Sequence, residues 1–250
     1  MKTLTYLISA IQKGLFTCFL FIVFVPVLLF TSIHAYSQQV AKELSFKSET
    51  LTGFLVYTPV NYRKDETATW PLILFLHGMG ERGDSIALVS VHGPPKNVKT
   101  NNDFPFIVVS PQLSDKVRRW STSELSALLD EIIAIYRIDT SRIYLTGLSM
   151  GGYGTWSWAS AEPERFAAIA PFCGGGNPEE AYKIGNIPTW VFHGEEDKAV
   201  SITESEKMVE ALGKAGGNVR FTRYSNTGHL CWDEAYDSGI LYDWFLHIRK

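Results

Sequence analysis

The amino-acid sequence predicts an α/β domain built on a mainly parallel, doubly wound sheet with helices on both faces. Short runs rich in β-branched residues alternate along the chain with stretches of helical periodicity, as in sheets whose parallel strands are joined by helices. Several runs, such as 72–76 and 106–109, are apolar at every position. A strand of this kind needs cover on both faces of its sheet, so helices are expected on both sides.

Seven strands and four helices are expected in order along the chain. The strands cover residues 53–58, 71–76, 106–110, 142–146, 167–171, 189–192 and 219–224. The first helix follows the capping-box pattern Ser121-Thr-Ser-Glu124 and has apolar residues at helical spacing. The other helices cover residues 150–161, 202–212 and 233–247. The intervals between these elements are mostly short, so no large lid domain is expected.

Composition favours a globular domain. Of the 250 residues, 46% are hydrophobic and 20% are charged, and the net charge is -3. Nothing in this balance indicates a nucleic-acid partner, which usually needs a basic patch. We expect residues 38–250 to form one folded domain.

The first 37 residues have the pattern of a signal peptide. Lys2 and Lys13 precede or flank an uncharged apolar stretch over 15–33, and Ala35-Tyr-Ser37 has small residues where a signal peptidase cleaves. We therefore expect a periplasmic or secreted protein that starts at Gln38, without stable membrane association. An uncleaved membrane anchor is the alternative, because the apolar stretch approaches the length of a bilayer span.

The clearest motif is Gly147-Leu-Ser149-Met-Gly151, which lies between an expected strand and an expected helix. A Gly-x-Ser-x-Gly sequence in this setting is a nucleophile elbow, in which a tight turn lifts the serine hydroxyl above the sheet. The two glycines provide room where side chains would collide. Ser149 is therefore the candidate nucleophile. The alternative is a glycine-rich turn with a solvent-exposed serine.

A serine nucleophile needs a general base. His229 lies just after the last expected strand, at a sheet edge where α/β proteins place functional groups. His193 lies at a strand end and His247 near a helix end, so both are expected to be structural.

The orienting acid is expected between the nucleophile and the base in the chain. Glu195, Glu196 and Asp197 compete for this role after the strand that ends near 192. Asp197 is favoured by its residue type and its Gly-x-x-Asp spacing. It would hold the His229 tautomer and stabilise the imidazolium ion.

An oxyanion hole requires two hydrogen-bond donors. We expect the backbone N–H groups of Met150 and Met79 in these roles, with Gly80 as the second choice for the latter. The loop over 77–83 also contains Gly-x-Gly-x-x-Gly. We reject a dinucleotide site there, because Gly-Pro-Pro at 93–95 interrupts the long helix that such a site needs.

His92, Trp120 and Trp232 are candidates for the border of a substrate pocket, although core or turn positions fit them equally. No His-Glu-x-x-His or paired-cysteine motif is present, so no metal site is expected. Cys173 and Cys231 are the two cysteines after residue 37. An oxidising compartment would permit a bond between them, and the sequence leaves open whether it forms.

With these motifs, residues 53–246 resemble the small secreted α/β-hydrolase esterases. The chain is similar to the phospholipase/carboxylesterase and feruloyl-esterase-like groups, and more distantly to the catalytic domain of prolyl oligopeptidases. The segments 171–176 and 232–236 share in the resemblance, whereas Leu230-Cys231 departs from the expected pattern. The resemblance implies hydrolysis of carboxylic esters through an acyl-enzyme without a cofactor.

The substrate class expected from this resemblance and from export is a small-molecule or polysaccharide-linked ester, such as a feruloyl or acetyl ester. Two alternatives remain open at this point. One is a peptidase of the prolyl-oligopeptidase type, which shares the chemistry. The other is a binding protein with a catalytically dead hydrolase fold.

Overall fold

The computed structural model describes residues 38–101 and 103–250, which belong to one compact unit. The signal peptide expected over 1–37 lies outside these residues. None of the helices in the described ranges is long and apolar enough to cross a membrane.

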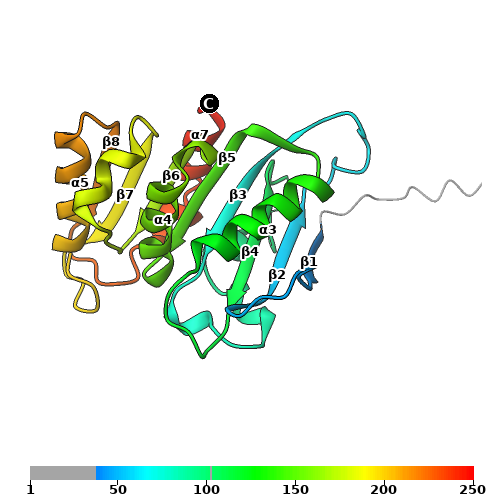
Figure 1. The fold of residues 1–250 in the computed structure, drawn as a ribbon, viewed down its shortest axis with the longest axis horizontal. Helices are drawn as coiled ribbons and strands as arrows, with labels where there is room; N and C mark the ends of the chain where they lie inside the picture. The colour runs from blue at the N-terminus through cyan, green and yellow to red at the C-terminus, as the bar shows by residue number, and fades with distance from the viewer. Residues whose placement is uncertain (1–37, 102) are drawn as a thin grey trace, which may run out of the picture. The chain divides into compact units, whose positions relative to one another are not determined.

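The described residues form one eight-stranded sheet (Figure 1). Its strands are β1 (Gln38–Lys42), β2 (Leu51–Thr58), β3 (Trp70–Leu76), β4 (Ile107–Leu113), β5 (Ile138–Leu148), β6 (Ala168–Phe172), β7 (Thr189–Gly194) and β8 (Val219–Tyr224). Their order across the sheet is β1-β2-β4-β3-β5-β6-β7-β8. The pairs β1–β2 and β2–β4 are antiparallel, and every other pair is parallel. The predicted mainly parallel sheet is therefore confirmed.

Helices cover both faces of the sheet, as predicted. The α-helices are α2 (Gly93–Asn97), α3 (Thr122–Ile135), α4 (Met150–Ala161), α5 (Thr203–Lys214), α6 (Trp232–Asp237) and α7 (Ile240–Leu246). The 3-10 helices are η1 (Met79–Glu81), η2 (Ile86–Ser90), η3 (Pro163–Arg165) and η4 (Pro178–Ile184).

Successive side chains of β3 enter different cores. Leu72 and Leu74 pack in one buried cluster with residues of α3, α4 and α5. Ile73 and Phe75 pack in a second cluster with residues of α6 and α7. Because alternate residues of a strand point to opposite faces, this division explains why the run is apolar throughout.

The predicted single helix over 233–247 was wrong. The structure has two helices, α6 and α7, with Gly239 between them at a φ of 79°. Glycine adopts this left-handed conformation without steric cost, so the chain breaks and restarts there.

Two further differences lie near the start of the fold. Strand β1 was not predicted, because its sequence is polar and its residues are exposed or half-buried. Antiparallel pairing with β2 holds it at the edge of the sheet. Ser121 caps α3, but the Glu124 carboxylate accepts hydrogen bonds from Ser48, Glu49 and Thr50 instead of completing the predicted box.

Candidate active site

Ser149 occupies a strained turn between β5 and α4. Its φ of 54° and ψ of -115° lie outside the regions that non-glycine residues prefer. A Cβ at Gly151 would overlap the carbonyl oxygen of Leu76, and one at Gly147 would lie 2.5 Å from the carbonyl oxygen of Gly151. The turn therefore packs against β3 so closely that only glycine fits on either side of the serine.

The structure brings Ser149, His229 and Asp197 together in one hydrogen-bonded chain. The Ser149 hydroxyl lies 3.0 Å from His229 Nε2, and His229 Nδ1 lies 2.6 Å from Asp197 Oδ2. Asp197 follows β7 and His229 follows β8, the next strand in the sheet. The carboxyl ends of these parallel strands meet at one edge, which explains how residues far apart in sequence converge.

The Asp197 carboxylate is fully buried, yet it is well supplied with donors. Its Oδ1 atom accepts hydrogen bonds from the backbone N–H groups of Ala199 and Val200, at 2.8 and 2.9 Å. Burial raises the pKa of Asp197, but hydrogen bonds from His229, Val200 and Ala199 outweigh it and lower the pKa below its ordinary value. The group is therefore a carboxylate at neutral pH.

His229 is 24% exposed and borders the open side of the site. Contact with Cys173 and the hydrogen bond to Asp197 raise the pKa of His229 to about 9, against the effect of burial. The surroundings of His229 thus favour the imidazolium form of its ring.

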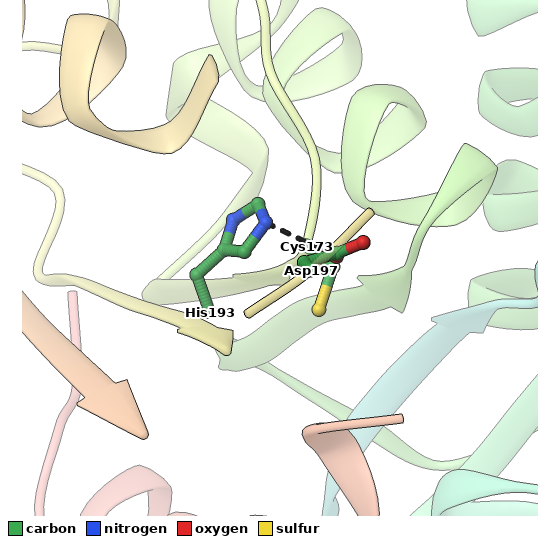
Figure 2. A group of neighbouring side chains, drawn as sticks. All are labelled: Cys173, His193 and Asp197. Carbon is green, nitrogen blue, oxygen red and sulfur yellow. Dashed lines mark ion pairs between the residues drawn. The ribbon is translucent and has the colours of Figure 1, made fainter. Parts of the chain in front are cut away.

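His193 contacts the carboxylate of Asp197. From the sequence we expected a structural role for His193 and did not predict this contact. Its Nε2 atom lies 3.2 Å from Asp197 Oδ2 and 3.0 Å from the carbonyl oxygen of Val200 (Figure 2). Because both neighbours are acceptors, Nε2 carries the proton, and Nδ1 lies 2.8 Å from the oxygen of Ser205, whose hydroxyl also contacts the carbonyl oxygen of Gly174 at 3.0 Å. Burial lowers the pKa of His193, which keeps the ring neutral.

Cys173, His193 and Asp197 offer three ligand-type atoms within 4.8 Å of one another (Figure 2). Each of these groups already has a protein partner. The Cys173 sulfur contacts Cys231, and the other two groups are hydrogen-bonded as described above.

Met79 and Met150, the predicted oxyanion donors, both line the pocket that contains Ser149 and His229. Met79 is the first residue of η1, and Met150 is the first residue of α4. The backbone N–H of a first helical residue has no partner within its own helix.

His77 fixes the loop that presents Met79, a role that the sequence analysis missed. The ring is fully buried, and its Nε2 atom accepts a hydrogen bond from Leu113 N–H at 3.0 Å. Its Nδ1 atom donates to the Gly78 carbonyl at 2.6 Å, while Gly78 N–H donates to Glu81. Burial lowers the pKa of His77 to about 4, which preserves this neutral tautomer. The short helix η1 lies in this loop, and the short helices η2 and α2 follow it in the chain.

A pocket of about 940 Å³ opens over Ser149 and His229. Of the three predicted border residues, Trp120 lines it. His92 and Trp232 do not belong to its lining. Trp232 is only 3% exposed and packs its ring edge-on against His229, at 5.2 Å between centroids, and His92 packs behind Trp232.

Five polar side chains line the same pocket without having been predicted. They are Arg118, Arg119, Tyr153, Ser157 and Asn177. Both arginines are exposed. No motif marks these residues, because they come from separate loops and from the outer side of α4.

The sheet, the strained serine turn and the hydrogen-bonded side chains on the loops after β7 and β8 define a hydrolase of the α/β-hydrolase fold. The model of the dienelactone hydrolase family matches residues 27–238. The chain belongs to this family.

Similar proteins include esterases. The chain is 30% identical over 169 residues to the bifunctional acetylxylan esterase/xylanase XynS20E of Neocallimastix patriciarum, covering 62% of this chain and 23% of that protein. It is 31% identical over 124 residues to poly(3-hydroxyalkanoate) depolymerase C of Paucimonas lemoignei, covering 43% of this chain and 28% of that protein. The chain thus spans about a quarter of the length of these curated relatives.

The structure is similar to the crystal structure of a thermostable esterase. The TM-score is 0.72 and the sequence identity is 29%, and the match covers 88% of this chain and 64% of the esterase chain.

Proposed function

We propose that this chain is a serine carboxylic-ester hydrolase that acts through an acyl-enzyme, with Ser149 as nucleophile, His229 as general base and Asp197 as orienting acid. One observation carries the proposal. The Ser149 hydroxyl lies within hydrogen-bond distance of an imidazole whose other nitrogen is bonded to a buried carboxylate. This is the arrangement that activates a serine for acyl transfer.

The reaction follows from these contacts. Ser149 Oγ attacks the ester carbonyl carbon while His229 Nε2 takes the hydroxyl proton, and Asp197 stabilises the imidazolium ion. The backbone N–H groups of Met79 and Met150 donate hydrogen bonds to the oxyanion of the tetrahedral intermediate. The intermediate collapses when His229 returns the proton to the departing alkoxide, which leaves as an alcohol.

Water then completes the cycle. His229 takes a proton from a water molecule, which attacks the acyl-enzyme carbonyl. The second tetrahedral intermediate expels Ser149 Oγ, which recovers its proton from His229. The products are the carboxylic acid and the free enzyme.

The substrate that we propose is an acetyl or feruloyl ester attached to a polysaccharide. The acetylxylan esterase named among the relatives supports this class. A pocket of about 940 Å³ that includes Trp120 and Tyr153 has room for a sugar or a phenolic group beside Ser149. Export, which residues 1–37 predict, would bring the enzyme to such a polymer. A mature N-terminus at Gln38, read by N-terminal sequencing, tests the export step.

A fluorophosphonate probe tests the nucleophile. Labelling is expected on the tryptic peptide 143–165, which contains Ser149. Absence of label on a folded protein would support a binding protein instead.

A substrate panel tests the reaction class. The panel comprises acetylated xylan, methyl ferulate, simple alkyl esters and a dipeptide p-nitroanilide. Release of acetate or ferulate in preference to simple alkyl acids supports the polysaccharide ester. Cleavage of the anilide but of no ester would indicate a peptidase of the prolyl-oligopeptidase type.

A further inference from the structure

Two buried cysteines meet directly behind His229. Cys173 follows the last residue of β6, and Cys231 lies two residues after His229. Their sulfur atoms are 2.7 Å apart, and the residues are 0% and 1% exposed. The two side chains therefore already point at one another, and a bond of about 2.05 Å needs only a small further approach.

We propose that Cys173 and Cys231 form a disulfide in the mature protein, and that this bond positions His229 relative to Ser149. The first part stands on the sulfur geometry alone. The second part rests on the function proposed above.

The chemistry of closure is a thiol–disulfide exchange. One cysteine thiolate attacks the disulfide of an oxidised thiol compound, such as glutathione disulfide, and releases one thiol of that compound. The second cysteine thiolate then displaces the other thiol from the mixed disulfide. The pair loses two protons and two electrons, and the glutathione disulfide is reduced to two thiols. Because the pair is buried once folded, exchange is expected during folding in an oxidising compartment.

The positioning role follows from the segments next to each cysteine, which are the serine turn beside Cys173 and the His229 loop beside Cys231. The Ser149 N–H donates to the carbonyl oxygen of Phe172 at 2.9 Å, so the residue before Cys173 holds the serine turn. The Cys173 sulfur lies 3.3 Å from the carbonyl oxygen of His229. A bond to Cys231 would therefore join the segment that holds the nucleophile to the segment that holds the base.

A reactive free thiol fits this site poorly. Hydrogen bonding with Cys231 and burial both raise the pKa of Cys173, which suppresses the thiolate. Cys173 also has a φ of 45°, a conformation that few non-glycine residues adopt, and this backbone directs its side chain toward the His229 loop.

Peptide mapping tests the bond. The full chain is refolded in a glutathione redox buffer, alkylated with iodoacetamide under denaturing conditions, and digested with trypsin. We expect peptide 166–183, which contains Cys173, to be linked to peptide 224–249, which contains Cys231, and to separate on reduction. Recovery of both peptides in alkylated form without reduction would overturn the bond.

Kinetics of the same preparation test the positioning role. The oxidised protein is compared with protein reduced in denaturant and refolded with both thiols free, and with Cys231→Ser. We expect kcat for an ester to fall roughly 10-fold in both, with KM unchanged, because the base is held less firmly.

The outcomes separate the claims. A linked peptide with equal kcat in all three proteins would overturn the positioning role and leave the bond in place. A linked peptide in a protein that hydrolyses no ester supports the bond while contradicting the proposed function.

Discussion

The Nε2 atom of His193 lies 3.2 Å from Oδ2 of Asp197, the same oxygen that receives the hydrogen bond of His229. One carboxylate is thus held between two imidazoles, of which one is neutral and buried and the other borders the pocket. His193 holds the Asp197 carboxylate on its buried side, and His229 binds the same carboxylate on the side of the pocket. The proposed triad therefore depends on a fourth side chain for its geometry.

Replacement of His193 by leucine should destabilise the protein. The change leaves the half-buried Val200 carbonyl and the buried Ser205 hydroxyl without this partner, and each lost bond costs on the order of 1–3 kcal/mol. Urea unfolding should show a lower midpoint for His193→Leu than for His193→Gln, whose amide can donate toward the same acceptors. Equal midpoints for the two variants would argue against the role of these hydrogen bonds.

Replacement of Asp197 by asparagine should reduce kcat for p-nitrophenyl acetate by a factor on the order of 10⁴, because the amide can hold the wrong imidazole tautomer. Glu196→Gln is the matched control, since Glu196 is the exposed neighbouring acid that competed for the role. Its kcat should equal that of the wild-type protein. If instead Glu196→Gln lost activity and Asp197→Asn did not, the acid would be misassigned.

The activity of the protein with both thiols reduced should rise with pH. His229 can accept the serine proton only when neutral, and its pKa is raised to about 9. The value of kcat/KM should therefore rise with pH, reach half of its final value at a midpoint near 9, and level off above it. The hydroxide-driven background rate is subtracted first. A midpoint near the ordinary value of 6.5 would show that Cys173 and Asp197 do not act on the ring in this way.

Alanine at Gly151 should prevent the native turn from forming, because the new Cβ would overlap the carbonyl oxygen of Leu76. We expect destabilisation of roughly 3 kcal/mol or more, or failure to fold. Gly80→Ala is the control, since a Cβ at Gly80 has no neighbour within 4 Å, and its stability should be close to wild type. Chemical unfolding of both variants makes the comparison. A Gly151→Ala protein as stable as Gly80→Ala would contradict the close packing.

Much of the fold could be predicted from local signals. Runs that are apolar at every position predict strands buried on both faces, and the structure confirms this for β3 and β4. The elements that escaped prediction lack such a signal. Strand β1 forms by pairing with the edge of β2, and its own sequence carries no strand pattern. The break between α6 and α7 depends on the single residue Gly239, which lies within a stretch of helical periodicity.

Some residues of the candidate site have a local sequence signal, and others do not. Ser149 has a motif, and Asp197 and His229 follow strands in a fixed chain order, so all three could be named in advance. His77 and His193 could not, because their roles depend on hydrogen bonds to Leu113 and Val200 that only the folded backbone provides. For Trp232 the sequence left open a place at the pocket border or in the core, and the structure buries its ring against His229.

The most direct test of the central claim is the initial rate of p-nitrophenyl acetate hydrolysis by the protein and by a folded Ser149→Ala variant. Removal of a triad serine typically lowers kcat by a factor on the order of 10⁴ or more. We predict a clear rate that is lost to this extent in the variant. Equal rates in both proteins would show that Ser149 is not the nucleophile and would contradict the account.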